Sequence, residues 1–251
     1  MSAETNERRV RAASFGGVAD VYERSRPGYP DDAVRWLTGG GHTADEPCDV
    51  VDLGAGTGKL TRSLVDLGHR VTAVEPLPEM LDQLRAAVPE ATAVEGGAEA
   101  IPLAAESADV VTVAQAFHWF DHGPALVEIA RVLRPGGRVA LVWNIRDESQ
   151  PYVSELSDAM VGRTGVDTGS VDPIDASGLF GPVERATFSH VQAVDRETML
   201  ALVRSRSYCA VLSAEEQAPV LQNVDDLFTE HARDGVLALP YLTECFRATR
   251  R

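Results

Sequence analysis

Positive charge is scarce in this sequence. Among its 251 residues, 23 are lysine or arginine and 38 are aspartate or glutamate, which gives a net charge of −15 at pH 7. A protein that binds nucleic acid neutralises phosphates with clustered cations, so this balance opposes a role in modifying DNA or RNA. We therefore expect no nucleic-acid partner.

Cysteine is scarce as well. Cys48, Cys209 and Cys245 lie far apart and show neither the spacing of a zinc site nor a disulfide framework. No apolar run is long enough to span a bilayer, and the first residues contain no apolar signal-peptide core. These absences lead us to expect a cytoplasmic protein with no metal ion and no membrane partner.

The chain is organised around residues 48–61, CDVVDLGAGTGKLT. An apolar start followed by leucines at helical spacing predicts a buried strand that turns through glycines into a helix. Gly54, Gly56 and Gly58 let the backbone approach a ligand, with the positive end of the helix behind them. Their GxGxG spacing differs from the GxGxxG of dinucleotide-binding dehydrogenases, which argues against a nicotinamide-dependent oxidoreductase. Alone, the motif is a weak signal for a ligand, and a tight strand-to-helix turn that binds nothing also explains it.

A second short strand, HRVTAVEP over 69–76, ends in Glu75. This acid lies about twenty residues beyond the glycine turn, where a carboxylate can accept hydrogen bonds from both hydroxyls of a ribose. The alternative is a surface carboxylate at a strand end.

Five segments in this order resemble the class I S-adenosylmethionine-dependent methyltransferases. They are DLGAGTGKLT (52–61), VEP (74–76), GGAEAIPL (96–103), ADVVTVAQAFHWF (108–120) and LRPGG (133–137). The opening FGGVADVYERSRPGYP and the ending LALPYLTECFRA are similar to the trans-aconitate methyltransferase-like subgroup, which extends the resemblance to nearly the whole chain.

Strands and helices alternate as far as residue 144, which predicts a parallel sheet with helices on both faces. With strands over 183–192 and 236–248, we expect a Rossmann-like, doubly wound α/β fold with a seven-stranded sheet, mostly parallel with an antiparallel final strand. Pro240 in that final strand indicates an edge or a bulge.

We expect a single domain over residues 1–251. Its parts are a lid arm at 14–30, a cofactor-binding core at 30–145, and a C-terminal part at 146–251 that contributes the acceptor pocket and the last strands. Within the last part, 168–178 is expected to be a loop or short turns, and Ser213 to cap a helix over 213–235.

The resemblance implies S-adenosylmethionine as cofactor, with S-adenosylhomocysteine as its product. It places Glu75 on the ribose hydroxyls and the pair Ala98–Glu99 on the adenine edge, where Glu99 stands in place of the commoner aspartate. The residues implied to bind the cofactor are Gly54, Ala55, Gly56, Thr57, Glu75, Pro76, Met80, Ala98, Glu99, Gln115 and Ala116.

Methyl transfer from a sulfonium is an in-line displacement, for which the protein aims the acceptor and excludes water. His118 follows the fourth expected strand, and its imidazole can act as a base near neutral pH. Its other possible roles are to brace the loop or to contact the cofactor. Tyr22 and Arg26 of the arm are the further catalytic candidates, and either Arg26 or Arg146 can pair with an acceptor carboxylate or form a surface salt bridge.

We therefore expect a methyltransferase that acts on a small-molecule acceptor, a carboxylate or hydroxyl of secondary metabolism, as a monomer or homodimer. O-methylation is slightly favoured over N- or C-methylation. The alternative is a protein on the same fold that binds S-adenosylmethionine but catalyses another reaction or none.

The arm generates a first prediction. Transfer needs a dry site that the cofactor can still enter and leave, and a segment ordered by the ligand meets both needs. Deleting residues 1–29 should abolish turnover and leave the sheet folded, as measured by methyl transfer and circular dichroism. Amide exchange over 14–30 should slow when cofactor is added. Full activity of the truncated protein, or exchange that ignores the cofactor, would contradict the lid role.

Overall fold

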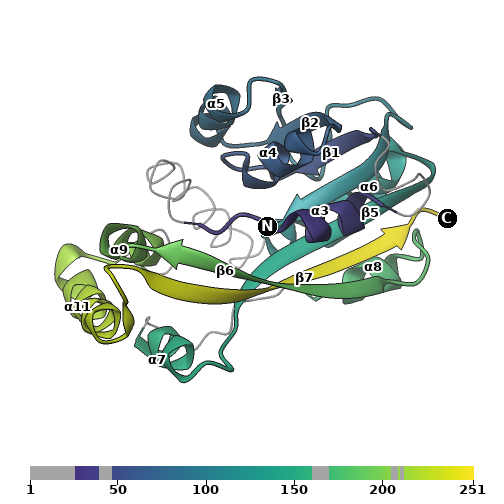
Figure 1. Ribbon diagram of the computed structural model, residues 1–251. Helices are drawn as coiled ribbons and strands as arrows, with labels where there is room; N and C mark the ends of the chain where they lie inside the picture. Colours follow the sequence, from purple (N-terminus) through teal and green to yellow (C-terminus); the bar gives the residue numbers. More distant parts are fainter. Residues whose placement is uncertain (1–25, 40–46, 160–169, 205–208, 210–211) are drawn as a thin grey trace. The chain divides into compact units, whose positions relative to one another are not determined.

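A computed structural model describes residues 26–39, 47–159, 170–204, 209 and 212–251 (Figure 1). The elements are α3 (Asp31–Thr38), β1 (Asp49–Leu53), α4 (Lys59–Asp66), β2 (Arg70–Glu75), α5 (Pro78–Ala87), β3 (Thr92–Glu95), β4 (Ala108–Ala114), the 3-10 helix η2 (Phe117–Trp119), α6 (His122–Val132), β5 (Leu133–Arg146), α7 (Pro151–Ala159), α8 (Asp172–Ser177), β6 (Glu184–Val194), α9 (Arg196–Arg204), α11 (Ala214–His231) and β7 (Leu237–Thr249). No helix in these ranges is long and apolar enough to cross a membrane.

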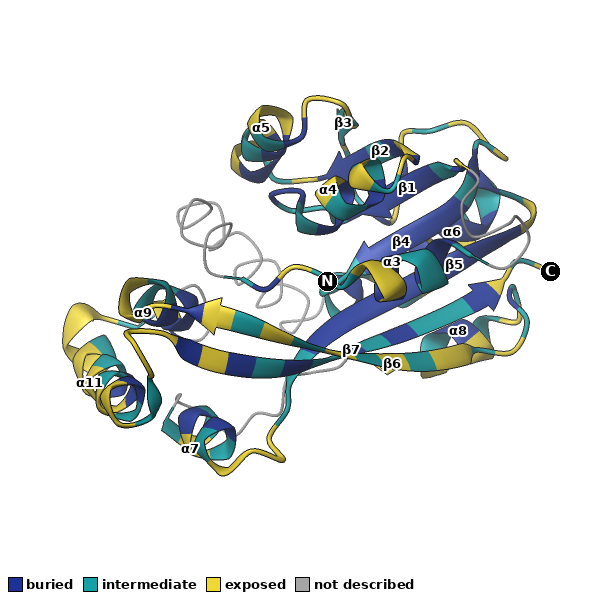
Figure 2. Ribbon diagram, in the orientation of Figure 1, coloured by how far each residue is buried: buried dark blue, intermediate teal, exposed yellow. Residues whose placement is uncertain are grey.

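The strands form one seven-stranded sheet in the order β3-β2-β1-β4-β5-β7-β6. Strands β1 to β5 pair in parallel, and the arrow of β7 runs opposite to those of β4 and β6 in Figure 2. The predicted fold class is therefore confirmed. Strand β7 lies between β5 and β6, so Pro240 does not sit on an edge strand.

Burial along the strands explains why helices flank this sheet. Successive side chains of a strand point to opposite faces, yet all four residues from Val50 to Leu53 are buried, as are 137–144 of β5. Figure 2 shows the same continuous burial along β1, β4 and β5. Apolar runs buried on both faces are the pattern that requires cover on each side.

The chain divides into two compact units. Unit 1 is Met1–Pro27, Ile145–Val166 and Ser189–Leu242, and unit 2 is Gly28–Asn144, Asp167–Phe188 and Thr243–Arg251. Strands β5, β6 and β7 each run through both units. The single-domain prediction is not tested by this division and stays a prediction.

The core of unit 2 joins helices to the sheet. Val34 and Leu37 of α3, Leu60 and Leu64 of α4 and Val142 of β5 belong to one buried cluster. The apolar faces of α3 and α4 thus pack into the same core as the sheet. Unit 1 has a cluster of its own, in which α7 and α9 contact α11.

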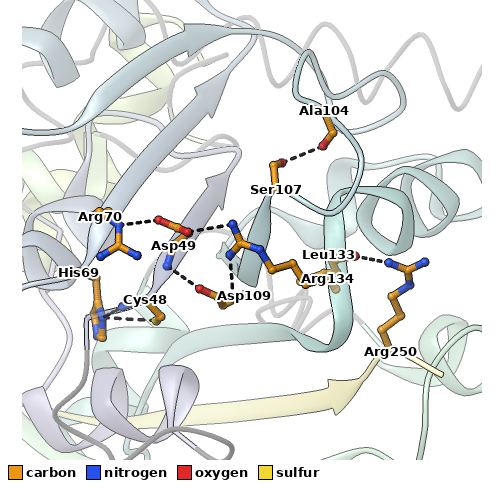
Figure 3. A network of polar contacts seen from close by, with 10 residues as sticks. All are labelled: Cys48, Asp49, His69, Arg70, Ala104, Ser107, Asp109, Leu133, Arg134 and Arg250. Atoms are coloured by element: carbon orange, nitrogen blue, oxygen red, sulfur yellow. Dashed lines mark hydrogen bonds and ion pairs between the residues drawn. The ribbon is translucent and has the colours of Figure 1, made fainter.

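A charged network ties together the amino ends of the strands in unit 2 (Figure 3). The carboxylate of Asp49 receives Arg70 at 2.6 Å and Arg134 at 2.9 Å, and Arg134 also donates to Asp109 at 2.7 Å. Asp109 accepts the amide of Asp49 at 2.8 Å. These contacts lie at the opposite end of β1 from the glycine turn, so they hold the strands in register away from that turn.

Three local expectations can be compared with the structure. The expected loop at 168–178 is wrong in part, because 172–177 form α8, which begins beside a proline and ends at Gly178 in the left-handed conformation. The Ser213 cap of α11 is confirmed: its hydroxyl accepts the amide of Glu216, whose side chain bonds back. Pro219 lies inside α11 and does not end it.

Candidate cofactor site at the carboxyl ends of β1, β2 and β4

The glycine turn between β1 and α4 has a backbone that three glycines make possible. Gly54, with φ 68°, Gly56, with φ 58°, and Gly58, with φ 93°, all lie in the left-handed region. A Cβ added at Gly54 would lie 2.9 Å from Cβ of Ala116, and one at Gly58 would lie 3.0 Å from Leu84. A Cβ at Gly56 would meet open space. The turn thus packs tightly on two sides and leaves Gly56 open to a ligand.

The turn holds the carboxylate of Glu75 at the end of β2. Oxygen Oε2 accepts the amide of Gly56 at 2.9 Å, and Oε1 accepts the amide of Leu77, the N-cap residue of α5, at 3.0 Å. Glu75 is 5% exposed, and burial raises its pKa while the two amides oppose that rise. Because each carboxylate oxygen has a second acceptor position, Glu75 can still accept hydroxyl groups.

Asp52, which the sequence marked only as the end of an apolar run, is buried two residues before the turn. It accepts the hydroxyl of Thr61 at 2.6 Å and that of Thr112 at 3.0 Å. Burial raises the pKa of Asp52 to about 6, and the two hydroxyls limit the rise. No ion pair reaches Asp52 within the described ranges. The signal that could have identified it is an acid placed directly before the glycines in a strand buried on both faces.

The other cofactor candidates in and after the turn lie on the same elements. The amide of Ala55 donates to the carbonyl of Val74 at 3.2 Å, which anchors the turn to β2. Thr57 is buried in the turn, Met80 faces the core from α5, and Pro76 is exposed before that helix. These residues therefore lie beside Glu75 in sequence or in the turn itself, as expected.

The loop after β3 carries the two positions expected at the adenine edge. Ala98 is buried and Glu99 is exposed. Oxygen Oε1 of Glu99 accepts the amide of Asp121, the N-cap residue of α6, at 2.9 Å. One oxygen of this carboxylate is thus fixed by α6.

The exit of β4 is held by polar contacts. Gln115 has φ 57°, which is uncommon for a residue other than glycine, and its amide donates to Val142 at 3.0 Å. Its Nε2 lies 3.4 Å from the carbonyl of Asn144. The buried side chain of Asn144, which the sequence did not single out, donates to the Gly28 carbonyl at 2.9 Å and accepts the Thr243 hydroxyl at 2.7 Å. A strained backbone kept in place in this way is typical of functional sites.

His118 is the middle residue of η2, two positions after Ala116. Its ring centroid is 4.5 Å from that of Trp119, and its Nδ1 is buried. Phe117 is fully buried and stacks on His122, whose Nε2 lies 3.1 Å from the Phe117 carbonyl. His122 thus braces η2, the short helix that carries His118.

The three predicted catalytic residues, Tyr22, Arg26 and His118, fall in different parts of the chain. Tyr22 lies outside the described residues, as does most of the predicted lid arm, and Arg26 belongs to unit 1 whereas His118 belongs to unit 2. The roles of these three residues stay predictions. Within the described ranges, no group of three or more His, Cys, Asp or Glu could hold a metal ion.

Comparisons with known proteins agree with this geometry. A family model described as "Methyltransferase domain" matches residues 51–141. An uncharacterized methyltransferase of Mycobacterium tuberculosis is 46% identical over 252 residues, covering 98% of this chain and 99% of the relative. A malonyl-(acyl-carrier protein) O-methyltransferase of Methylococcus capsulatus is 38% identical over 144 residues, 55% of this chain and 52% of that one. A solved structure of a candidate type II methyltransferase from Anaeromyxobacter dehalogenans has a TM-score of 0.63 at 24% identity, covering 90% and 97%.

The buried carboxyl of Asp52 generates a prediction on stability. Its folded pKa is raised from 3.8 to about 6, so the folded state binds the proton more tightly than the unfolded state. The stabilisation is complete below pH 4 and is lost as the pH rises through about 6, a loss on the order of 3 kcal/mol. Asp52→Asn should remove most of this pH dependence, as measured by urea unfolding between pH 4 and pH 8.

Asp82→Asn, on the exposed side of α5, is the matched control. Its free energy of unfolding should follow the wild-type pH dependence. Parallel curves for wild type and Asp52→Asn across this range would show that Asp52 does not titrate as the burial argues.

Proposed function

This chain belongs to the class I S-adenosylmethionine-dependent methyltransferases, and from that premise we propose that it methylates a carboxylate or hydroxyl of a small molecule. The observation that carries the proposal is the Glu75 carboxylate, held by the amides of Gly56 and Leu77 at the end of β2. Ligands of open α/β sheets bind outside the carboxyl ends of the strands, which is where this carboxylate lies.

The residues around the turn suit S-adenosylmethionine chemically. Glu75 would accept the ribose hydroxyls, and the open space at Gly56 would let the ribose approach the backbone. The amide of Ala98 would meet a ring nitrogen of adenine, and the carboxylate of Glu99 its exocyclic amine. When bound, the cofactor supplies an electrophilic methyl group on a sulfonium.

The task of the protein in the transfer is to aim the acceptor and exclude water. A hydroxyl acceptor has to lose a proton, and His118 would take it on its imidazole. A carboxylate acceptor is already ionised at neutral pH and needs no base. For such an acceptor, Arg26 of unit 1 or Arg146, which donates to Ser157 at 3.1 Å, would supply the paired cation.

An acidic acceptor is the form of the proposal that we favour. Both ends of the chain resemble the trans-aconitate methyltransferase-like subgroup, and we propose that the chain belongs there. The relative from Methylococcus capsulatus is named for O-methylation of a malonyl group, and its aligned part covers 55% of this chain. Neither similarity identifies the molecule that is methylated, so the acceptor is proposed by chemical class.

A third prediction tests the cofactor. The protein should bind S-adenosylhomocysteine with a dissociation constant in the micromolar range, about −7 to −8 kcal/mol, and should not bind NAD tightly. Glu75→Gln should weaken binding by about 1.5–3 kcal/mol, because a charged acceptor is lost. Calorimetry on both ligands measures this, and Glu79→Gln on the exposed start of α5 serves as the control. Tight NAD binding without S-adenosylhomocysteine binding would refute the cofactor assignment.

A fourth prediction separates transfer from binding alone. With a donor labelled in its methyl group, a panel of small carboxylic acids should yield labelled product. Alkali should release the label as methanol if the product is an ester, whereas an ether or a methylated nitrogen or carbon retains it. Binding of S-adenosylhomocysteine with no label in any small molecule would favour the alternative, a protein on this fold with another reaction or none.

A further inference from the structure

The loop after β3, residues 96–103, has a tightly determined shape. It folds back so closely that a Cβ added at Gly96 would lie 2.6 Å from the ring of Pro102. Gly97 and Ala100 form an isolated antiparallel bridge, and the amide of Leu103 donates to the carbonyl of Ile101 at 2.8 Å. Ala98 and Glu99 lie at the tip of this fold, so the shape of the loop sets where their polar groups point.

Two side chains of α6 hold the returning half of the loop by its backbone. The guanidinium of Arg131 donates to the carbonyl of Ile101 at 2.8 Å and to that of Leu103 at 2.9 Å. The carboxylate of Glu128 accepts the amide of Ile101 at 2.9 Å. Ile101 is thus bound through both its amide and its carbonyl, as a residue is bound by a neighbouring strand.

The same two side chains hold each other. Arg131 donates to the two oxygens of Glu128, both at 2.7 Å. This hydrogen bond is the main cause that lowers the pKa of Glu128, so the carboxylate stays ionised and accepting. A planar guanidinium can make these four contacts at once, whereas a lysine ammonium cannot reproduce their geometry. The chemistry of the pair requires arginine for the loop, and not merely a positive charge on the helix.

A second ion pair in unit 2 shows what an ordinary pair of this spacing looks like. Asp82 and Arg85 of α5 are also an acid followed by an arginine three residues later, and they contact at 2.9 Å, with the arginine side chain 53% and the aspartate side chain 74% exposed. Arg131 and Glu128 are 35% and 20% exposed. Of the two pairs, the one on α6 also binds backbone groups of the loop. These contacts do not contribute to the helix itself, so they point to a role in the loop.

The start of α6 holds the other half of the loop, because the amide of Asp121 donates to Glu99 at 2.9 Å. Residues 99–103 are therefore fixed to α6 at both ends. We propose that Arg131 and Glu128 are positioning residues that preorganise this loop for adenine, without touching the cofactor. The proposal rests on the proposed function, since it assumes that Ala98 and Glu99 meet the adenine edge.

A positioning role differs measurably from a structural one. We call the pair of Arg131 and Glu128 the clamp. If the clamp only stabilised the fold, its loss would weaken the binding of all ligands of the site alike. If it aims Ala98 and Glu99, its loss should weaken the ligand that has the exocyclic amine more than the ligand that lacks it. S-adenosylhomocysteine and S-inosylhomocysteine form such a pair, because they differ at that position of the base.

The experiment compares the dissociation constants of these two ligands for the full-length protein and its variants. Wild type should prefer the adenine ligand. Arg131→Lys, which keeps the charge, and Glu128→Gln, which keeps the shape, should each reduce that preference by about tenfold, the effect of one misplaced hydrogen bond. Amide exchange over 97–103 should quicken in both variants. Arg85→Lys should leave the preference and the exchange unchanged.

Two outcomes overturn the proposal in different ways. If wild type binds S-adenosylhomocysteine and both folded variants keep the wild-type preference, the clamp does not position the loop and this inference alone is wrong. If wild type binds neither ligand, the proposed cofactor is wrong and the inference falls with it. Thermal unfolding of each variant, measured in parallel, identifies loss of fold as the cause of any weaker binding.

Discussion

The hydrogen bonds from the amides of Gly56 and Leu77 to one carboxylate are the contacts on which the cofactor side of this protein depends. Through them Glu75 joins the end of β2 to the turn before α4 and to the N-cap residue of α5. The turn is also bound to β2 by its backbone, since the amides of Gly54 and Ala55 both donate to the carbonyl of Val74. Where two helices begin is thus decided at the end of one strand.

This arrangement places two buried acids at one end of the sheet. The charge of Asp52 adds to burial in raising the pKa of Glu75, and burial alone raises that of Asp52 to about 6. Neither acid has a cationic partner among the residues described, so folding gains nothing from their ionisation. Buried ionisable groups without an ion-pair partner are characteristic of functional sites. Glu75 has acceptor positions left, and the ribose hydroxyls proposed above would be donors of the kind that it can accept.

The parts of this structure that were predictable are those in which one backbone requirement dictates one residue type. Gly54 and Gly58 were predictable because no side chain fits there. The parallel part of the sheet was predictable from apolar runs that alternate with helices. The roles of Asp52 and Asn144 could not be predicted. A polar residue near the end of a strand has the same sequence pattern whether it is exposed or hydrogen-bonded to residues far away in the chain. Asn144 acquires its role from Gly28 and Thr243, which lie 116 and 99 positions away in the chain. The clamp on α6 could not be predicted for the same reason. An acid and an arginine three residues apart indicate a helix-surface ion pair, and nothing in that pattern indicates that both also bind the backbone of a loop.

The contacts of Asn144 also bear on why the acceptor side carries no motif. Gly28 and Asn144 are the two ends of one segment of unit 2, and Thr243 begins another. The side chain of Asn144 binds both Gly28 and Thr243. The cofactor unit is therefore closed off by its own hydrogen bonds at three of the points where the chain leaves it. The hydrogen bonds described above for the turn and Glu75 come from residues 54–77, which lie inside unit 2. Because aiming an acceptor and excluding water are requirements of shape, and a carboxylate acceptor needs no base, no single residue type is forced on the acceptor side.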